Sequence, residues 1–91
     1  MKPTVWHSHN NDCIHAHVQG ETDNSYQVSL QWLVVEDAPS GQFIIHESCT
    51  TYSSIGKVDS ETRMYQRNSP PTPEIVTNLL HEYVQRQAKK Y

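Results

Sequence analysis

The sequence predicts one α+β domain, residues 1–91, in which an antiparallel sheet of three to five strands packs against a C-terminal helix. Two patterns predict this fold. Apolar and polar residues alternate over 25–35, as in a strand with one buried face, and apolar residues recur at helical spacing over 73–89. No apolar run approaches the roughly 20 residues that span a bilayer, so we expect a soluble, cytoplasmic protein.

The hydrophobic core is expected to be small. Hydrophobic residues make up 35% of the chain, below the roughly 45–50% typical of globular domains. A metal ion or a partner subunit, including a second copy of the chain, would supplement the stability of so small a core. Cys13 and Cys49 are too few to staple a secreted scaffold, and we expect them to be free thiols.

Residues 25–35 predict the central strand of the sheet. One face carries apolar side chains at alternate positions, namely Tyr26, Val28, Leu30, Trp32 and Val34. Towards the end of this strand Leu33 and Val35 make the other face apolar as well. We therefore expect that end of the strand to be covered on both sides.

The chain after the central strand predicts a hairpin. Residues 36–41 form a turn cluster with Pro39 and Gly41, and residues 42–52 form the next strand. Residues 53–71 fit neither the helical nor the strand period cleanly. Within them we expect 61–67 as a strand at the edge of the sheet, followed by a connector that two prolines keep out of regular structure.

The helix is predicted over 73–89. Thr72 is a suitable N-cap, Pro73 suits the first helical turn, and Glu74 complements the helix dipole. Six apolar residues fall on one stripe that would face the sheet: Ile75, Val76, Leu79, Leu80, Tyr83 and Val84.

Four of the six histidines lie within residues 7–17. If a three-residue loop joins two strands here, His7 lies opposite His15 and His9 opposite Cys13, all on one face, and the four could bind zinc. If the loop has two residues, the histidine pairs point to opposite faces. The alternative to a zinc site is a polar edge hairpin whose buried face consists of Ile14, Ala16 and Val18.

The sequence predicts no enzyme and no required cofactor. It contains three glycines and no phosphate-binding loop, and nothing selects a nucleophile with its base. A small polar-rich sheet with one helix instead favours a protein-interaction module. Compact chains of this kind are common among phage and mobile-element accessory proteins, so we expect an inhibitor that occupies the surface of a host nuclease or defence protein.

Two loops carry acidic residues that would suit a partner protein with a basic groove: Glu21 and Asp23 in one, Glu36 and Asp37 in the other. A third hypothesis, after zinc binding, is weak nucleic-acid binding. Residues 63–91 carry five basic residues against two acids, and Tyr26, Trp32, Tyr52 or Tyr65 could stack bases beside Arg63 and Arg67. The net charge of −3 opposes this hypothesis.

Overall fold

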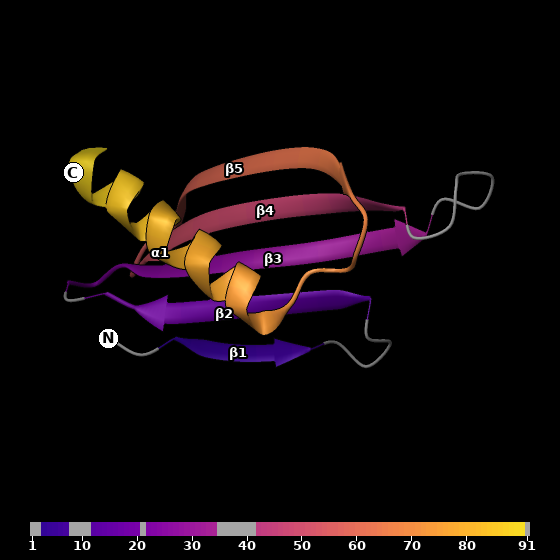
Figure 1. Ribbon diagram of the computed structural model, residues 1–91. Coiled ribbons are helices and arrows are strands. Elements are labelled where there is room, and N and C mark those ends of the chain that lie inside the picture. Colours follow the sequence, from indigo (N-terminus) through magenta and orange to yellow (C-terminus); the bar gives the residue numbers. More distant parts are fainter. Residues whose placement is uncertain (1–2, 8–11, 21, 35–41, 91) are drawn as a thin grey trace.

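A computed structural model describes residues 3–7, 12–20, 22–34 and 42–90, and shows a five-stranded antiparallel sheet with one helix across one face (Figure 1). Neighbouring strands in the sheet are also neighbours in the chain. They are β1 (Thr4–His7), β2 (Cys13–Gln19), β3 (Ser25–Val34), β4 (Phe43–Ser53) and β5 (Gly56–Arg67), followed by α1 (Pro73–Lys90). The predicted α+β fold class is confirmed.

Helix α1 lies diagonally across the sheet, with its N-terminal end beside β2 and its C-terminal end towards β4 and β5 (Figure 1). The predicted N-cap is present, because the Ile75 amide donates to Thr72 Oγ1 at 3.2 Å. Val76, Leu80 and Tyr83 are fully buried against the sheet. In the described part of the chain no helix is long and apolar enough to cross a membrane.

The core lies between α1 and the face of the sheet that it crosses, which we call the helix face. Alternate residues of three strands are buried there: Ile14, Ala16 and Val18; Tyr26, Val28 and Leu30; Ile45 and Cys49. This arrangement confirms the predicted buried faces of residues 13–18 and of most of the central strand. We call the opposite side of the sheet the open face.

A polar network joins the C-terminal half of α1 to the sheet. The Thr51 hydroxyl donates to Gln87 Oε1 at 3.0 Å and lies 2.7 Å from the Tyr83 hydroxyl. Gln87 Nε2 in turn donates to Asp59 Oδ2 on β5 at 2.9 Å. Because Thr51, Tyr83 and Gln87 are buried, these hydrogen bonds satisfy groups that would otherwise destabilise the core.

The C-terminal end of β3 differs from the sequence prediction. Leu33 and Val34 are 60% and 65% exposed, although both were expected to be covered, and Val35 lies outside the described residues. Val34 is exposed because β3 continues well past the area that α1 crosses on the helix face (Figure 1). Leu33 points to the open face, which no described element covers. The prediction that this end is covered on both sides is therefore wrong for Leu33 and for Val34.

Strand β5 is longer than predicted, because it begins at Gly56 rather than at residue 61. Ser54 and Ile55 form the tip of the β4–β5 hairpin, and Gly56 follows with a φ of 115°, a backbone conformation that glycine adopts most easily. A register shift between Thr51 and Tyr52 accompanies this turn. The irregularity disrupts the period of two, which explains why the start of the strand was missed.

Candidate functional site

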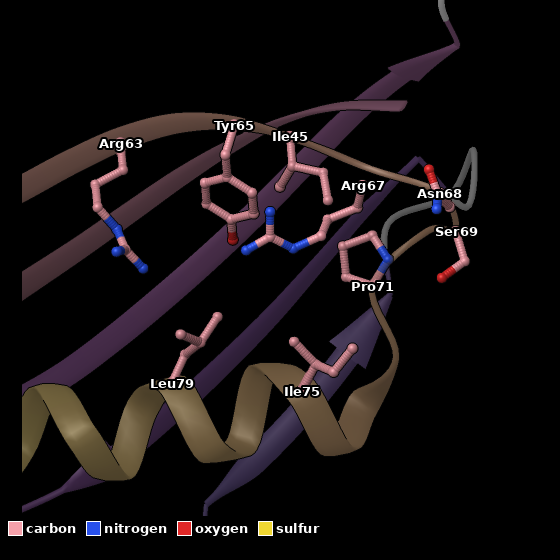
Figure 2. Close-up of a pocket in the computed structure, with 9 residues that line it drawn as sticks. All are labelled: Ile45, Arg63, Tyr65, Arg67, Asn68, Ser69, Pro71, Ile75 and Leu79. Atoms are coloured by element: carbon pink, nitrogen blue, oxygen red, sulfur yellow. The ribbon is translucent and has the colours of Figure 1, made fainter. Parts of the chain in front are cut away.

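A pocket of about 370 Å³ lies between β4, β5 and the N-terminal half of α1 (Figure 2). The pocket exists because α1 crosses the sheet diagonally, so that the N-terminal end of the helix lies farther from β5 than its C-terminal end does. The connector that follows β5 closes one end. The lining consists of Ile45, Arg63, Tyr65, Arg67, Asn68, Ser69, Pro71, Ile75 and Leu79, and we call it the wedge pocket.

One side of the wedge pocket is apolar. Ile75 and Leu79 point from α1 towards the sheet, and Ile45 points from β4 into the same space (Figure 2). Pro71 is buried at the end formed by the connector. Ile75 belongs to the apolar stripe of α1 and yet is 45% exposed. The pocket therefore offers apolar surface that the protein's own core does not cover.

The opposite side of the wedge pocket is built on a buried carboxylate, Glu47, which is 3% exposed. Arg63 donates to it twice, from Nε at 2.8 Å and from Nη2 at 2.9 Å, and the Tyr65 hydroxyl donates at 3.2 Å. The hydrogen bonds and the charge of Glu47 raise the pKa of Arg63. Burial, together with the charge of Glu47 and the hydrogen bond to it, raises the pKa of Tyr65 to about 12.

Arg67 is a second cation of the wedge pocket, and Glu47 forms its ion pair with Arg63 instead. The Arg67 guanidinium lies 4.4 Å from the centre of the Tyr65 ring, and Nη1 donates to the Gln66 carbonyl at 2.8 Å. Within residues 3–7, 12–20, 22–34 and 42–90 no carboxylate forms an ion pair with Arg67. Arg63 is already paired with Glu47, so among the described residues the wedge pocket combines one cation without an ion-pair partner with an apolar wall.

The side chains that line the wedge pocket are apolar, neutral polar or cationic. None of the nine lining residues is Asp, Glu, His or Cys, the usual general bases and strong nucleophiles. Tyr65, with a pKa of about 12, keeps its proton at neutral pH. A guanidinium beside apolar side chains complements an anionic group on an apolar body.

Of the acidic residues predicted to bind a partner, Asp23 alone is described, and it is not among the lining residues of this pocket. Glu21, Glu36 and Asp37 lie outside the described residues. Asp23 is exposed in the turn between β2 and β3. Their role as a partner-binding set therefore stays a prediction.

The predicted zinc ligands are placed only in part. Cys13 and His15 lie on the open face of β2, with Sγ and Nε2 3.2 Å apart, and Trp6 stacks on the His15 ring at 5.1 Å. Burial lowers the pKa of His15, and its Nδ1 atom is buried with no hydrogen-bond partner in the described part of the chain. His9 and the His7 side chain lie outside what the structure describes.

The strand register also differs from both registers considered for these histidines. His7 pairs with Ile14 and Trp6 pairs with His15, whereas the quartet required His7 opposite His15. The register aligns Val5 with Ala16, so apolar residues of both strands share the helix face. Among the described residues no three His, Cys, Asp or Glu side chains gather as metal ligands. Zinc binding itself stays untested.

The aromatic residues considered for base stacking do not share one surface. Tyr26 is buried in the core, and Trp32 packs partly buried against it. Tyr52 lies on the open face of β4, while Tyr65 lies on the helix face of β5. The structure thus divides this set among the core and two surfaces.

Sequence reasoning missed Glu47, the residue on which the pocket is built. It stands in phase with Ile45 and Cys49, so the alternation in β4 places a carboxylate on the buried face. Such a position requires a partner charge, since an unpaired buried carboxylate is costly. That signal, read together with Arg63 on the next strand, could have identified the pair.

The fold and the wedge pocket define a small α+β domain with a surface pocket that is partly apolar and partly cationic. No family model matches the chain, and no curated protein or solved structure shows significant similarity to it.

Proposed function

We propose that this chain is a non-enzymatic protein-interaction module that holds a carboxylate-bearing apolar segment of a partner protein in the wedge pocket. The observation that carries the proposal is Arg67, a guanidinium with no ion-pair partner among the described residues, beside the apolar wall of Ile45, Ile75 and Leu79. A guanidinium can bind a carboxylate with two parallel hydrogen bonds, which fixes the orientation of the bound group.

The size of the pocket suits this kind of ligand. A volume of about 370 Å³ lies at the lower end of the range for small-ligand pockets, roughly 300–1,000 Å³. One or two side chains of a peptide fill such a space. The apolar wall would contribute affinity by burying the apolar side chain, and Arg67 would select for the anionic group.

A protein segment is favoured over a free metabolite because of the neighbouring edge strand. Arg63, Tyr65 and Arg67 project from β5, which lies at the edge of the described sheet and pairs there with β4 alone. An edge strand presents backbone N–H and C=O groups that an extended segment can pair with. The segment could thus combine backbone pairing along β5 with side-chain burial in the wedge pocket.

This proposal changes the expected chemistry of the partner. The acidic loops suggested a basic groove, whereas the wedge pocket suits an acidic and apolar segment. The narrower hypothesis of a phage-type inhibitor of a host nuclease or defence protein rests on the small size of the chain and its lack of catalytic motifs, and it stays a prediction. Arg67 offers no support for it.

The experiment is a screen of short synthetic peptides in which Asp, Glu or a free C-terminal carboxylate stands next to Leu, Ile or Phe. We expect the wild-type chain to bind a subset, Arg67→Met to lose at least tenfold in affinity, and Arg86→Met to bind normally. Arg86 is the matched control, because it is a cation whose ion pair with Glu61 lies outside the pocket. Equal affinities of all three proteins would contradict the proposal.

A second candidate function is zinc binding by the N-terminal strands, which the 3.2 Å separation of Cys13 Sγ and His15 Nε2 favours. Zinc titration of the metal-free protein, with a chelator control, tests it. A rise in melting temperature that Cys13→Ser abolishes would support this function. The absence of any shift would exclude it.

A further inference from the structure

The open face of the sheet lacks the charged residues that a solvated strand surface usually carries. Residues facing this side occupy about twenty strand positions, and at the chain's average of 19% charged residues about four of them would be Asp, Glu, Lys or Arg. Lys57, at the hairpin end of β5, is the only such residue in the described strands.

Strand β5 shows the contrast within a single element. Its helix face carries the charged residues Asp59, Glu61, Arg63 and Arg67. Its open face carries Ser60, Thr62, Met64 and Gln66 in the intervening positions. Depletion of charge is typical of the centre of a protein–protein interface.

Large apolar side chains are exposed on the same face. Trp6 is 40% exposed, Leu33 60% and Met64 63%. On this face Leu33 of β3 pairs with Ile44 of β4. The next β4 residue on the same face, His46, pairs with Met64 of β5. Leu33, Ile44 and Met64 therefore form one cluster near the end of the sheet. Trp6 lies at the other side of the face, on β1.

We propose that the open face binds the open face of a second copy of this chain. A two-fold symmetric interface sets a surface against itself, so a charged face would meet charges of its own sign. The described strands carry no Asp, Glu, Lys or Arg at the centre of this face, so this repulsion does not arise there. The five strands are 4 to 12 residues long and contain 44 residues in all. At about 3.3 Å per residue and about 4.8 Å between strands they give a flat area on the order of 700 Å². That area approaches the roughly 800 Å² of accessible surface that each partner buries in a standard stable interface.

This dimer is independent of the proposed peptide-binding function, because the wedge pocket lies on the helix face of the sheet. The two sheets would stack as the layers of a β-sandwich do, about 10 Å apart. Both wedge pockets would then face outward.

Sedimentation velocity across low to high micromolar concentrations tests the dimer. The informative variant is Gln27→Glu with Gln31→Glu, which adds two carboxylates to the open face of the central strand β3 and hardly changes its shape. We expect the wild-type chain to sediment as a dimer of 10.5 kDa subunits and the double variant to dimerise at least tenfold more weakly. Gln85→Glu, on the exposed side of α1, is the matched control and should leave the dimer intact.

Circular dichroism and thermal melting separate loss of the interface from loss of the fold. The double variant should keep the wild-type spectrum, because Gln31 is exposed in the single chain and Gln27 is only partly covered. A wild-type chain that stays monomeric at high micromolar concentration would overturn the proposal. A folded double variant that dimerises as tightly as wild type would overturn it as well.

Discussion

The Arg63 guanidinium on β5 binds the buried Glu47 carboxylate on β4 through two hydrogen bonds, at 2.8 and 2.9 Å. The two residues are direct partners in the register of the strands. The pair lets a carboxylate occupy a position that is 3% exposed, and it orients the side of the wedge pocket that carries Tyr65. Its removal is the most informative test of how the pocket is held together.

Replacing Arg63 with Met should lower the free energy of unfolding by about 2 kcal/mol. A buried carboxylate that loses its cation typically costs about 3–5 kcal/mol, and the 63% exposure of the Arg63 side chain argues for a smaller loss. Urea denaturation measures the change. In the Arg63→Met background, Glu47→Gln should recover part of the stability, because it removes the unpaired charge. If Glu47→Gln lowers stability equally in both backgrounds, the two residues are not coupled.

Thr51→Val should destabilise the protein by about 1–3 kcal/mol, because it removes a buried partner from both Tyr83 and Gln87. The side chains are nearly equal in volume, so packing changes little. Thr50→Val is the matched control on the adjacent residue, which faces the open side of β4. Thermal or urea unfolding should separate the two variants clearly. Equal stabilities would show that the network between β4 and α1 contributes nothing.

The two cysteines should differ in thiol reactivity. Cys49 is 2% exposed, and burial together with the charge of Glu47 raises the pKa of its thiol to about 12. A colorimetric thiol reagent at mildly alkaline pH should label Cys13, which is only partly buried, and leave Cys49 unmodified until urea is added. Cys13→Ser should therefore abolish labelling of the folded protein. Fast modification of Cys49 in that variant would contradict the strand register that buries Cys49 on the helix face.

Tyr65 should make the stability fall at alkaline pH. Its pKa is near 10 in an unfolded chain and about 12 in the folded protein. Between these values the unfolded state has lost the proton and the folded state retains it, so the stability contributed by the protonated phenol is complete below pH 10 and is lost as the pH rises towards 12. Urea denaturation at a series of pH values gives the free energy of unfolding, which should fall less steeply with rising pH for Tyr65→Phe than for wild type. An unchanged slope would mean that Tyr65 titrates normally.

The sequence allowed prediction of the elements whose pattern is local. The N-cap at Thr72 and the stripe through Val76, Leu80 and Tyr83 specified α1, and alternation specified the interior of β3. The start of β5 was missed because a turn and a register shift interrupt its alternation.

The wedge pocket could not be predicted from such local patterns. It depends on the angle at which α1 crosses the sheet, which sets the space between Ile75 on the helix and Tyr65 on β5. No periodicity encodes that angle. The pairing of β1 with β2 had the same limit, since two registers were compatible with the histidine spacing and the structure shows a third that aligns Val5 with Ala16.

The most direct test of the central claim is a chemical-shift titration of the ¹⁵N-labelled chain with the tightest-binding peptide from the screen. We predict that the largest amide shifts fall on β5 near Arg67, on Ser69 in the connector and on the first two turns of α1 around Ile75 and Leu79. They should disappear in Arg67→Met and persist in Arg86→Met. Shifts confined to the open face, around Gln31 and Met64, would contradict the wedge pocket as the site of partner binding.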